Sequence, residues 1–170
     1  PSIGAGRTDP LGLVSTRRLV HPEQVVLAYP PFYGLDSLSL PRPTLKALLL
    51  EASEQGVVFL LRGVPPGKSV KDCVNALKEV LGTDRERVPN VLIDPSAFQQ
   101  FSVSVVPTVV TYAHPPYWVR IEGDIGLGAF HRMADASPSD RNVSLARNGR
   151  VSEIAEPDLV QELQRRMMAF

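Results

Sequence analysis

Cysteine is almost absent from this chain, which has one cysteine, Cys73, among 170 residues. A single cysteine excludes an internal disulfide and a Cys-x-x-Cys redox pair, and it leaves the redox compartment open. Eighteen basic residues balance eighteen acidic residues, so no excess of positive charge indicates binding to nucleic acid or to an anionic membrane. The uninterrupted apolar runs are only a few residues long and are too short to span a bilayer.

The three histidines lie far apart in the sequence, and His21 and His114 each precede a proline. Neither a metal-ligand spacing nor a nucleophile with an adjacent base is visible, so we expect no metal, no cofactor and no catalytic residue. No positively charged segment followed by an apolar stretch opens the chain, and we expect a mature chain that lacks its signal peptide. Apolar and charged contents of 44% and 21% are those of a globular protein.

Proline is abundant, with 16 residues that cluster at loops and segment boundaries. These boundaries predict an N-terminal extension over residues 1–23 and one folded domain over residues 24–136. A short edge strand is expected at Val25–Tyr29, near the start of that domain. The polar, turn-rich residues 137–148 are typical of a linker, and residues 149–170 form a separate final segment.

Helical and strand patterns alternate within the predicted domain. Apolar residues spaced i, i+3, i+4 and i+7 predict amphipathic helices, and short uninterrupted apolar runs predict buried strands. This alternation predicts an α/β domain with a central mixed β-sheet flanked by helices. The expected strands are 35–40, 57–61, 91–93, 107–112 and 117–121, and the expected helices follow Pro43, Ser69, Asp94 and Asp124. Gly56 is expected to end the first helix, and Ser69 with Asp72 resembles a capping box at the start of the second.

One of these strands starts directly at a Val106-Pro107 step. Proline has no N–H for the sheet ladder and therefore belongs at the first position of a strand, and an X-Pro bond can be cis or trans. The segment resembles the element with which thioredoxin-like domains place a cis-proline beside their active site. This resemblance implies a thioredoxin-like fold in which residues 39–42, Ser-Leu-Pro-Arg, occupy the Cys-x-x-Cys position.

Short motifs follow one another between residues 37 and 134. They are Ser37–Pro41, Leu61–Val64, Asp94-Pro95 with Phe98, Val105–Val110 and Gly123–Leu127. In this order and spacing they resemble the TrbC-type F-pilus assembly proteins of F-type conjugative type IV secretion systems. Leu40 departs from the Met of that family, and Gly126 departs from its usual Ser.

The final segment resembles a different protein of the same systems. Residues 149–159 read Gly-Arg-Val-Ser-Glu-Ile-Ala-Glu-Pro-Asp-Leu and are similar to the Gly-x-x-x-x-Ile-x-Glu-Pro-Asp-Leu motif at the start of mature TraW. The chain thus resembles a natural TrbC–TraW fusion. This resemblance implies a periplasmic assembly factor of a Gram-negative donor cell, with other pilus assembly proteins as partners and a TraW-like region that binds the TrbC-like domain.

The final segment is also predicted to end in a docking helix that opens at Pro157. A helix of this length is marginal alone in water, so its apolar face is expected to dock on a TrbC-like domain. Whether that domain belongs to the same chain or to a neighbouring molecule is left open. The residues assigned to this docking segment are Ile154, Pro157, Leu159, Val160, Leu163 and Met167.

A site for an extended peptide is expected beside the Val106-Pro107 step, where a thioredoxin-like fold holds such peptides. Binding of this kind pairs backbone groups and needs no redox group. Arg62, at the end of a predicted strand, either binds a carboxylate bidentately or ties a loop down through backbone carbonyls. The candidate binding residues are Ser39, Pro41, Arg62, Val106, Pro107 and Thr108.

An enzymatic function is the main alternative to a binding function. Cys73 lies near a predicted helix start and close to Lys71, which favours a reactive thiolate of the kind used by a periplasmic thiol oxidoreductase or isomerase-like chaperone. However, it also lies on the apolar stripe of its helix, where cysteine behaves as a small buried hydrophobe. Ser39 has no adjacent base in the sequence. We therefore expect a structural Cys73 and a non-enzymatic protein.

Overall fold

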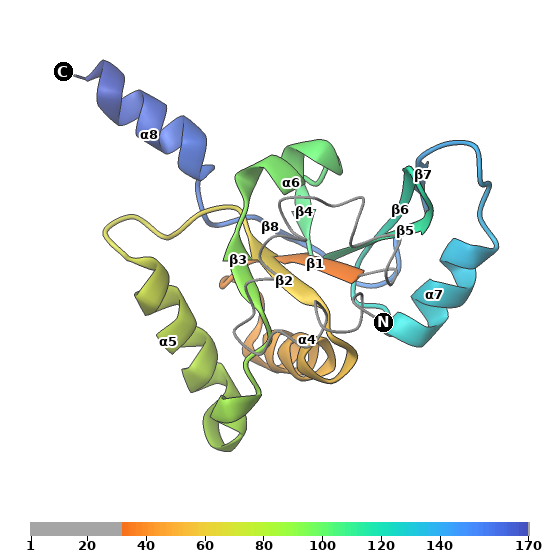
Figure 1. Cartoon of the computed structure of the whole chain (residues 1–170). Coiled ribbons are helices and arrows are strands. Elements are labelled where there is room, and N and C mark those ends of the chain that lie inside the picture. The colour runs from red at the N-terminus through yellow and green to blue at the C-terminus, as the bar shows by residue number, and fades with distance from the viewer. Residues whose placement is uncertain (1–31, 170) are drawn as a thin grey trace, which may run out of the picture.

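Strands and helices alternate along the computed structural model, which describes residues 32–169 (Figure 1). The predicted N-terminal extension and the predicted strand at Val25–Tyr29 lie outside the described residues. The elements in chain order are β1 (Phe32–Asp36), α4 (Arg42–Gln55), β2 (Val58–Leu61), α5 (Val70–Leu81), η1 (Gly82–Arg87), β3 (Val91–Ile93), α6 (Pro95–Gln100), β4 (Val105–Val106), β5 (Thr108–His114), β6 (Tyr117–Glu122), α7 (Leu127–Asp135), β7 (Val143–Ser144), β8 (Ser152–Glu153) and α8 (Leu159–Met168).

Six of the strands form one mixed sheet in the order β3-β2-β1-β5-β6-β7. Strands β1, β2 and β3 are parallel, whereas β5 is antiparallel to β1 and β6 is antiparallel to β5. Helices α4, α5 and α7 lie on one side of this sheet and α6 lies on the other (Figure 1). The predicted α/β architecture, a central mixed sheet flanked by helices, is confirmed.

Apolar side chains from the sheet and its helices form the core. Leu35 of β1 and Leu49 of α4 are fully buried, as is Phe130 of α7. On the α6 side of the sheet, the Phe101 ring packs against Trp118 with ring centroids 6.0 Å apart. Burial of such side chains is the main stabilising contribution to folding.

Several predicted helix boundaries are confirmed. Gly56 ends α4 in the left-handed conformation, with φ of 70°, which glycine adopts without steric cost. Ser69 and Asp72 form the predicted capping box at the start of α5. The Asp94 side chain caps α6, and Pro95 is its first residue.

Other boundaries differ from the prediction. Strand β1 ends at Asp36 rather than Leu40, because residues 37–40 turn and the Leu40 N–H donates to the Ser37 carbonyl oxygen at 3.2 Å. Asp124 does not cap α7, which begins three residues later at Leu127. Pro157 does not open α8 either.

Helix α8 begins at Leu159, because the preceding residue, Asp158, provides the cap. The Asp158 side chain accepts the N–H of Gln161 at 3.0 Å. Aspartate satisfies an orphan N–H at a helix start, whereas a proline side chain cannot. The sequence motif Pro157-Asp158 therefore places the helix start one residue after the aspartate.

Part of the predicted linker adds a strand to the sheet. Strand β7 pairs in parallel with β6, with Val143 opposite Val119 and Ser144 opposite Arg120. After β7, the N–H of Asn148 donates to the Glu122 carbonyl oxygen at 2.9 Å. The segment beyond residue 148 consequently starts from a position fixed at the edge of the sheet.

Candidate functional site

Residues 152–158, which we call the tail segment, lie against the domain. Strand β8 within this segment pairs antiparallel with β4, so that Glu153 lies opposite Val105 and Ser152 lies opposite Val106. Addition of a strand through backbone pairing is a general mode of peptide recognition. The tail segment therefore lies beside the Val106-Pro107 step, where the sequence predicted an extended peptide. The residues that contact it, which we call the tail-binding site, are Ser37, Leu38, Arg62, Gly63, Val105 and Val106.

Arg62, which directly follows β2, holds the backbone of the tail segment. Its Nε and Nη2 atoms donate to the Glu156 carbonyl oxygen at 3.0 and 2.7 Å. Nη2 also lies 3.5 Å from the Ile154 carbonyl oxygen, and the Arg62 carbonyl accepts the N–H of Leu159 at 3.4 Å. Of the two roles considered for Arg62, the geometry matches the one that uses backbone carbonyls rather than a carboxylate.

The Glu156 side chain is the deepest part of the tail segment. Only 1% of the residue is exposed, and its Oε2 atom accepts the backbone N–H of Leu38 at 2.9 Å. The sequence analysis quoted Glu156 as part of a motif but gave it no contact, because an unpaired glutamate is almost never fully buried and is therefore expected on the surface. Its partner Leu38 lies 118 residues earlier in the chain.

Two serines at the start of the α4 region support this contact. The Ser37 hydroxyl oxygen accepts the N–H of Ala155 at 3.3 Å and lies 2.8 Å from the Ser39 hydroxyl oxygen. Ser37 is fully buried, whereas the predicted site residue Ser39 is exposed. The serine that contacts the tail segment is therefore Ser37, and Ser39 contacts Ser37 instead. Pro41 is exposed at the N-cap position of α4.

Glycine at position 63 is required for the close approach of the tail segment. A Cβ atom placed on Gly63 would lie 2.1 Å from the Pro157 carbonyl oxygen, a separation that real Cβ atoms do not adopt. Backbone can approach this closely only where a side chain is missing. The sequence analysis singled out the Leu61–Val64 motif for its resemblance but did not assign Gly63 a role.

Pro107 and Thr108 are buried and hold β4 in place. The Val106-Pro107 peptide bond is cis, and the Pro107 carbonyl oxygen accepts the N–H of Gly123 at 2.8 Å. The Thr108 hydroxyl donates to the Val105 carbonyl oxygen at 2.8 Å. These two predicted site residues thus fix the edge on which β8 pairs.

Helix α8 follows the tail segment but extends away from the domain (Figure 1). Within its predicted docking face, Val160 and Leu163 are each 50% exposed and Met167 is 76% exposed, whereas Leu159 is half-buried. Ile154, upstream of the helix, packs against the main core. The extended tail segment is consequently what attaches to the domain, and docking of the helix face stays a prediction.

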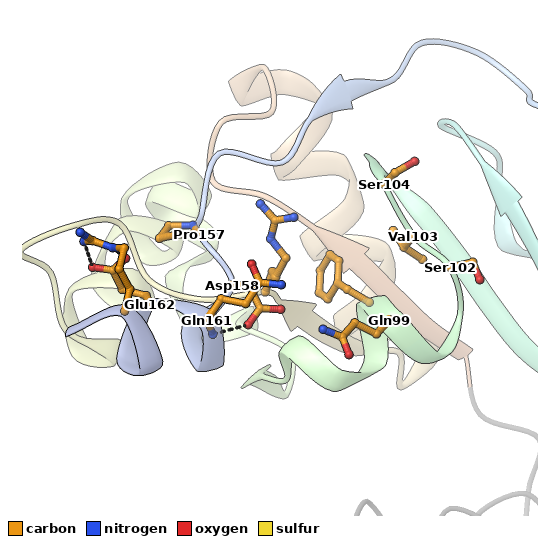
Figure 2. A pocket seen from close by; sticks show the side chains of 11 residues that line it. Gln99, Ser102, Val103, Ser104, Pro157, Asp158, Gln161 and Glu162 are labelled. Atoms are coloured by element: carbon orange, nitrogen blue, oxygen red, sulfur yellow. Dashed lines mark hydrogen bonds and ion pairs between the residues drawn. The ribbon is translucent and has the colours of Figure 1, made fainter. Parts of the chain in front are cut away.

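A cavity of about 480 Å³ lies between the region around α6 and the start of α8. Figure 2 shows its lining, in which Pro157 and Asp158 face Gln99 and Ser102–Ser104 across the opening. The Asp158 carboxylate is already engaged by the N–H of Gln161. The cavity is thus a gap left beside the bound tail segment, with polar groups at its rim.

The environment of Cys73 is that of a structural cysteine. The residue is 1% exposed on α5. Burial raises the pKa of its thiol, and the negative charges of Glu156 and Asp72 raise it further. A reactive cysteine requires the opposite, a thiolate stabilised by nearby positive charge and open to solvent. Across residues 32–169, moreover, no three His, Cys, Asp or Glu side chains are grouped so as to hold a metal ion.

The comparison with known families identifies the family of the domain. The model of the family described as type-F conjugative transfer system pilin assembly proteins, of the TrbC type, matches residues 35–134, more than half of the chain. No curated protein and no solved structure matches the chain. No helix in the described part of the chain has the length and apolar character needed to cross a bilayer. The family match shows that this chain belongs to the type-F conjugative transfer system pilin assembly proteins.

Proposed function

We propose that this chain is a non-enzymatic, periplasmic assembly factor that works by binding extended polypeptide segments at its tail-binding site. Membership of the family makes it a component of F-type conjugative pilus assembly. The observation that best supports a binding function is the seating of the tail segment as an added antiparallel strand on β4. Arg62 and Ser37 hold the residues after that strand by their backbone groups.

The fold that supports this function is assigned as thioredoxin-like. Helix α4 follows the first described strand, and the β5–β6 hairpin follows the Val106-Pro107 step and leads into α7. Residues 39–42, at the start of α4, take the Cys-x-x-Cys position and contain no sulfur. The surface that such folds use for extended peptides is consequently retained without the thiols.

The bound tail segment also suggests the kind of partner. Residues 149–159 resemble the start of TraW, and they are the residues that lie in or next to the tail-binding site. We propose that a TraW-like strand is the ligand of this site, supplied by the same chain or by a second molecule. The exposed apolar face of α8 is then available to a further pilus assembly protein.

The competing thiol-enzyme function is tested through Cys73. In native protein at about pH 8, we expect the thiol to react with a disulfide reagent at least about tenfold more slowly than in the unfolded chain, because burial and a raised pKa suppress the thiolate. The same reaction in denaturant is the control. The matching variant, Cys73→Ser, is expected to support pilus assembly in donor cells as well as the unchanged chain. Rapid native reaction, or loss of pili with normally folded Cys73→Ser, would support the enzyme instead.

A further inference from the structure

Two buried carboxyl groups lie where the tail segment enters the domain: Glu156 accepts the N–H of Leu38, two residues after Asp36. Asp36, the last residue of β1, is 2% exposed, and Glu156 is 1% exposed. One oxygen of each, Asp36 Oδ1 and Glu156 Oε1, is buried and makes no hydrogen bond within the described residues. Since a buried carboxylate oxygen without a partner is strongly unfavourable, two charged groups here would not be stable side by side.

Within the described residues, no Arg or Lys side chain forms an ion pair with the carboxyl oxygens of Asp36 and Glu156 to neutralise them. Arg62 directs its N–H groups to the carbonyl oxygens of Glu156 and Ile154. The Cys73 thiol of α5 brings no positive charge, and its pKa is raised by burial and then by the Glu156 charge. Glu51 of α4 lines a small cavity with Asp36 and accepts the N–H of Leu127 at 3.3 Å. A proton held between the two carboxyl groups would satisfy both orphan oxygens.

We propose that the tail-binding site recognises a glutamic acid that precedes a proline and follows the strand paired with β4, and that it binds this side chain together with one proton shared with Asp36. The inference rests on the proposed function, because it specifies how the same site selects its strand. The proton comes from solvent when the strand binds and returns to solvent when the strand leaves. In the bound state one carboxyl donates an O–H to the other, which stays ionised.

Proton uptake gives binding of the tail segment a defined pH dependence. With the tail segment in place, burial and then the charge of Glu156 raise the pKa of Asp36 to about 8. When the tail segment leaves, Glu156 returns to water and Asp36 no longer faces its charge, so the pKa of Asp36 falls. Between these two pKa values the bound state holds one proton more than the released state. Binding must therefore weaken as pH rises toward about 8 and must level off above it.

Hydrogen exchange of the full chain, read by mass spectrometry from about pH 5 to about pH 9, tests this inference. The readout is the protection of the amides of residues 152–159, corrected for intrinsic exchange, with the amides of β5 as an internal reference. For the unchanged chain we expect the fraction of released tail segment to rise by up to about tenfold per pH unit and to reach a plateau above about pH 8.

Two variants remove the shared proton and keep the shape of the side chains. Asp36→Asn and Glu156→Gln each leave one carboxyl that need not share a proton, and the amide oxygen at position 156 can still accept the N–H of Leu38. We expect the tail segment to stay protected in both variants, with protection that depends on pH less than in the unchanged chain, because the new amide can donate to the remaining carboxylate. Position 156 lies outside the sheet, so Glu156→Gln alone provides the test if Asp36→Asn does not fold.

Each other outcome contradicts a different claim. If the unchanged chain shows no more pH dependence than the two variants, the shared proton is wrong, while strand binding stands. If β5 follows the same pH dependence as the tail segment, the effect belongs to global unfolding and the inference is again wrong. If residues 152–159 are unprotected at every pH, the proposed binding function itself fails.

Discussion

Replacing Gly63 with alanine is expected to release the tail segment while leaving the sheet folded. The new Cβ atom would lie 2.1 Å from the Pro157 carbonyl oxygen and 3.3 Å from the Leu159 nitrogen. Both obstacles are backbone atoms, so no side chain can rotate away to make room. Overpacking of this kind costs about 1 to 3 kcal/mol, and the tail segment can escape it by leaving.

The measurement is hydrogen exchange of residues 152–159 in the full chain, compared with residues 108–114 of β5. We expect exchange of the tail segment to increase at least about fivefold in Gly63→Ala, which corresponds to about 1 kcal/mol. The matched control is Gly128→Ala in α7, where the nearest atom would lie 3.7 Å from the added methyl group. Unchanged protection of the tail segment in Gly63→Ala would mean that Pro157 does not occupy this position.

Replacing Arg62 with methionine is expected to weaken tail binding by about tenfold or more. Methionine keeps an apolar stem of similar length but removes the N–H groups that donate to the Glu156 and Ile154 carbonyl oxygens. Hydrogen bonds that involve a charged group contribute about 1.5 to 3 kcal/mol each. Arg62→Lys should give an intermediate effect, because an ammonium group cannot reproduce the fork of guanidinium donors.

A second arginine provides the control for this prediction. Arg42 also donates to a backbone carbonyl, that of Glu79 at 3.3 Å, but this contact joins α4 to α5 on the surface. Arg42→Met should leave exchange in the tail segment unchanged, as judged by the same amides. Equal effects of the two substitutions would show that loss of any surface arginine loosens the chain and that Arg62 has no specific role.

Local patterns in the sequence were sufficient for most of the domain. The i, i+3, i+4 spacing predicted α4, and Ser69 with Asp72 predicted the start of α5, because these signals act between residues close in the chain. The apolar run after the Val106-Pro107 step likewise predicted β5. Two-residue strands such as β7 have too few residues to show a pattern, and the polar composition of residues 137–148 therefore indicated a linker.

The contacts of the tail segment could not be predicted in the same way. Burial of Glu156 depends on Leu38 and Asp36, which lie more than a hundred residues earlier in the chain. Turn geometry also decides which serine reaches the tail segment, because residues 37–40 leave the strand direction after Asp36. For α8, periodicity predicts that an apolar face exists, but it does not identify what covers that face.

The central claim is that Ser152 and Glu153, at the start of the tail segment, pair with β4 in a defined register. Disulfide trapping in the full chain tests it, with Val105→Cys and Glu153→Cys introduced together with Cys73→Ser. Directly opposite residues in an antiparallel pair have Cβ atoms about 4.5 to 5.5 Å apart, and diagonal neighbours lie about 7 to 8 Å apart. The control pair, Val105→Cys with Val151→Cys, is shifted by two residues.

We expect the pair at positions 105 and 153, which lie opposite each other, to form a disulfide rapidly under mild oxidation and the shifted pair to form it slowly. The product should migrate as a monomer under non-reducing conditions, because the tail segment lies on its own domain. A dimer would place the same contacts between two copies of the chain. Equal rates for the two cysteine pairs would contradict the register and, with it, the assignment of this surface as a strand-binding site.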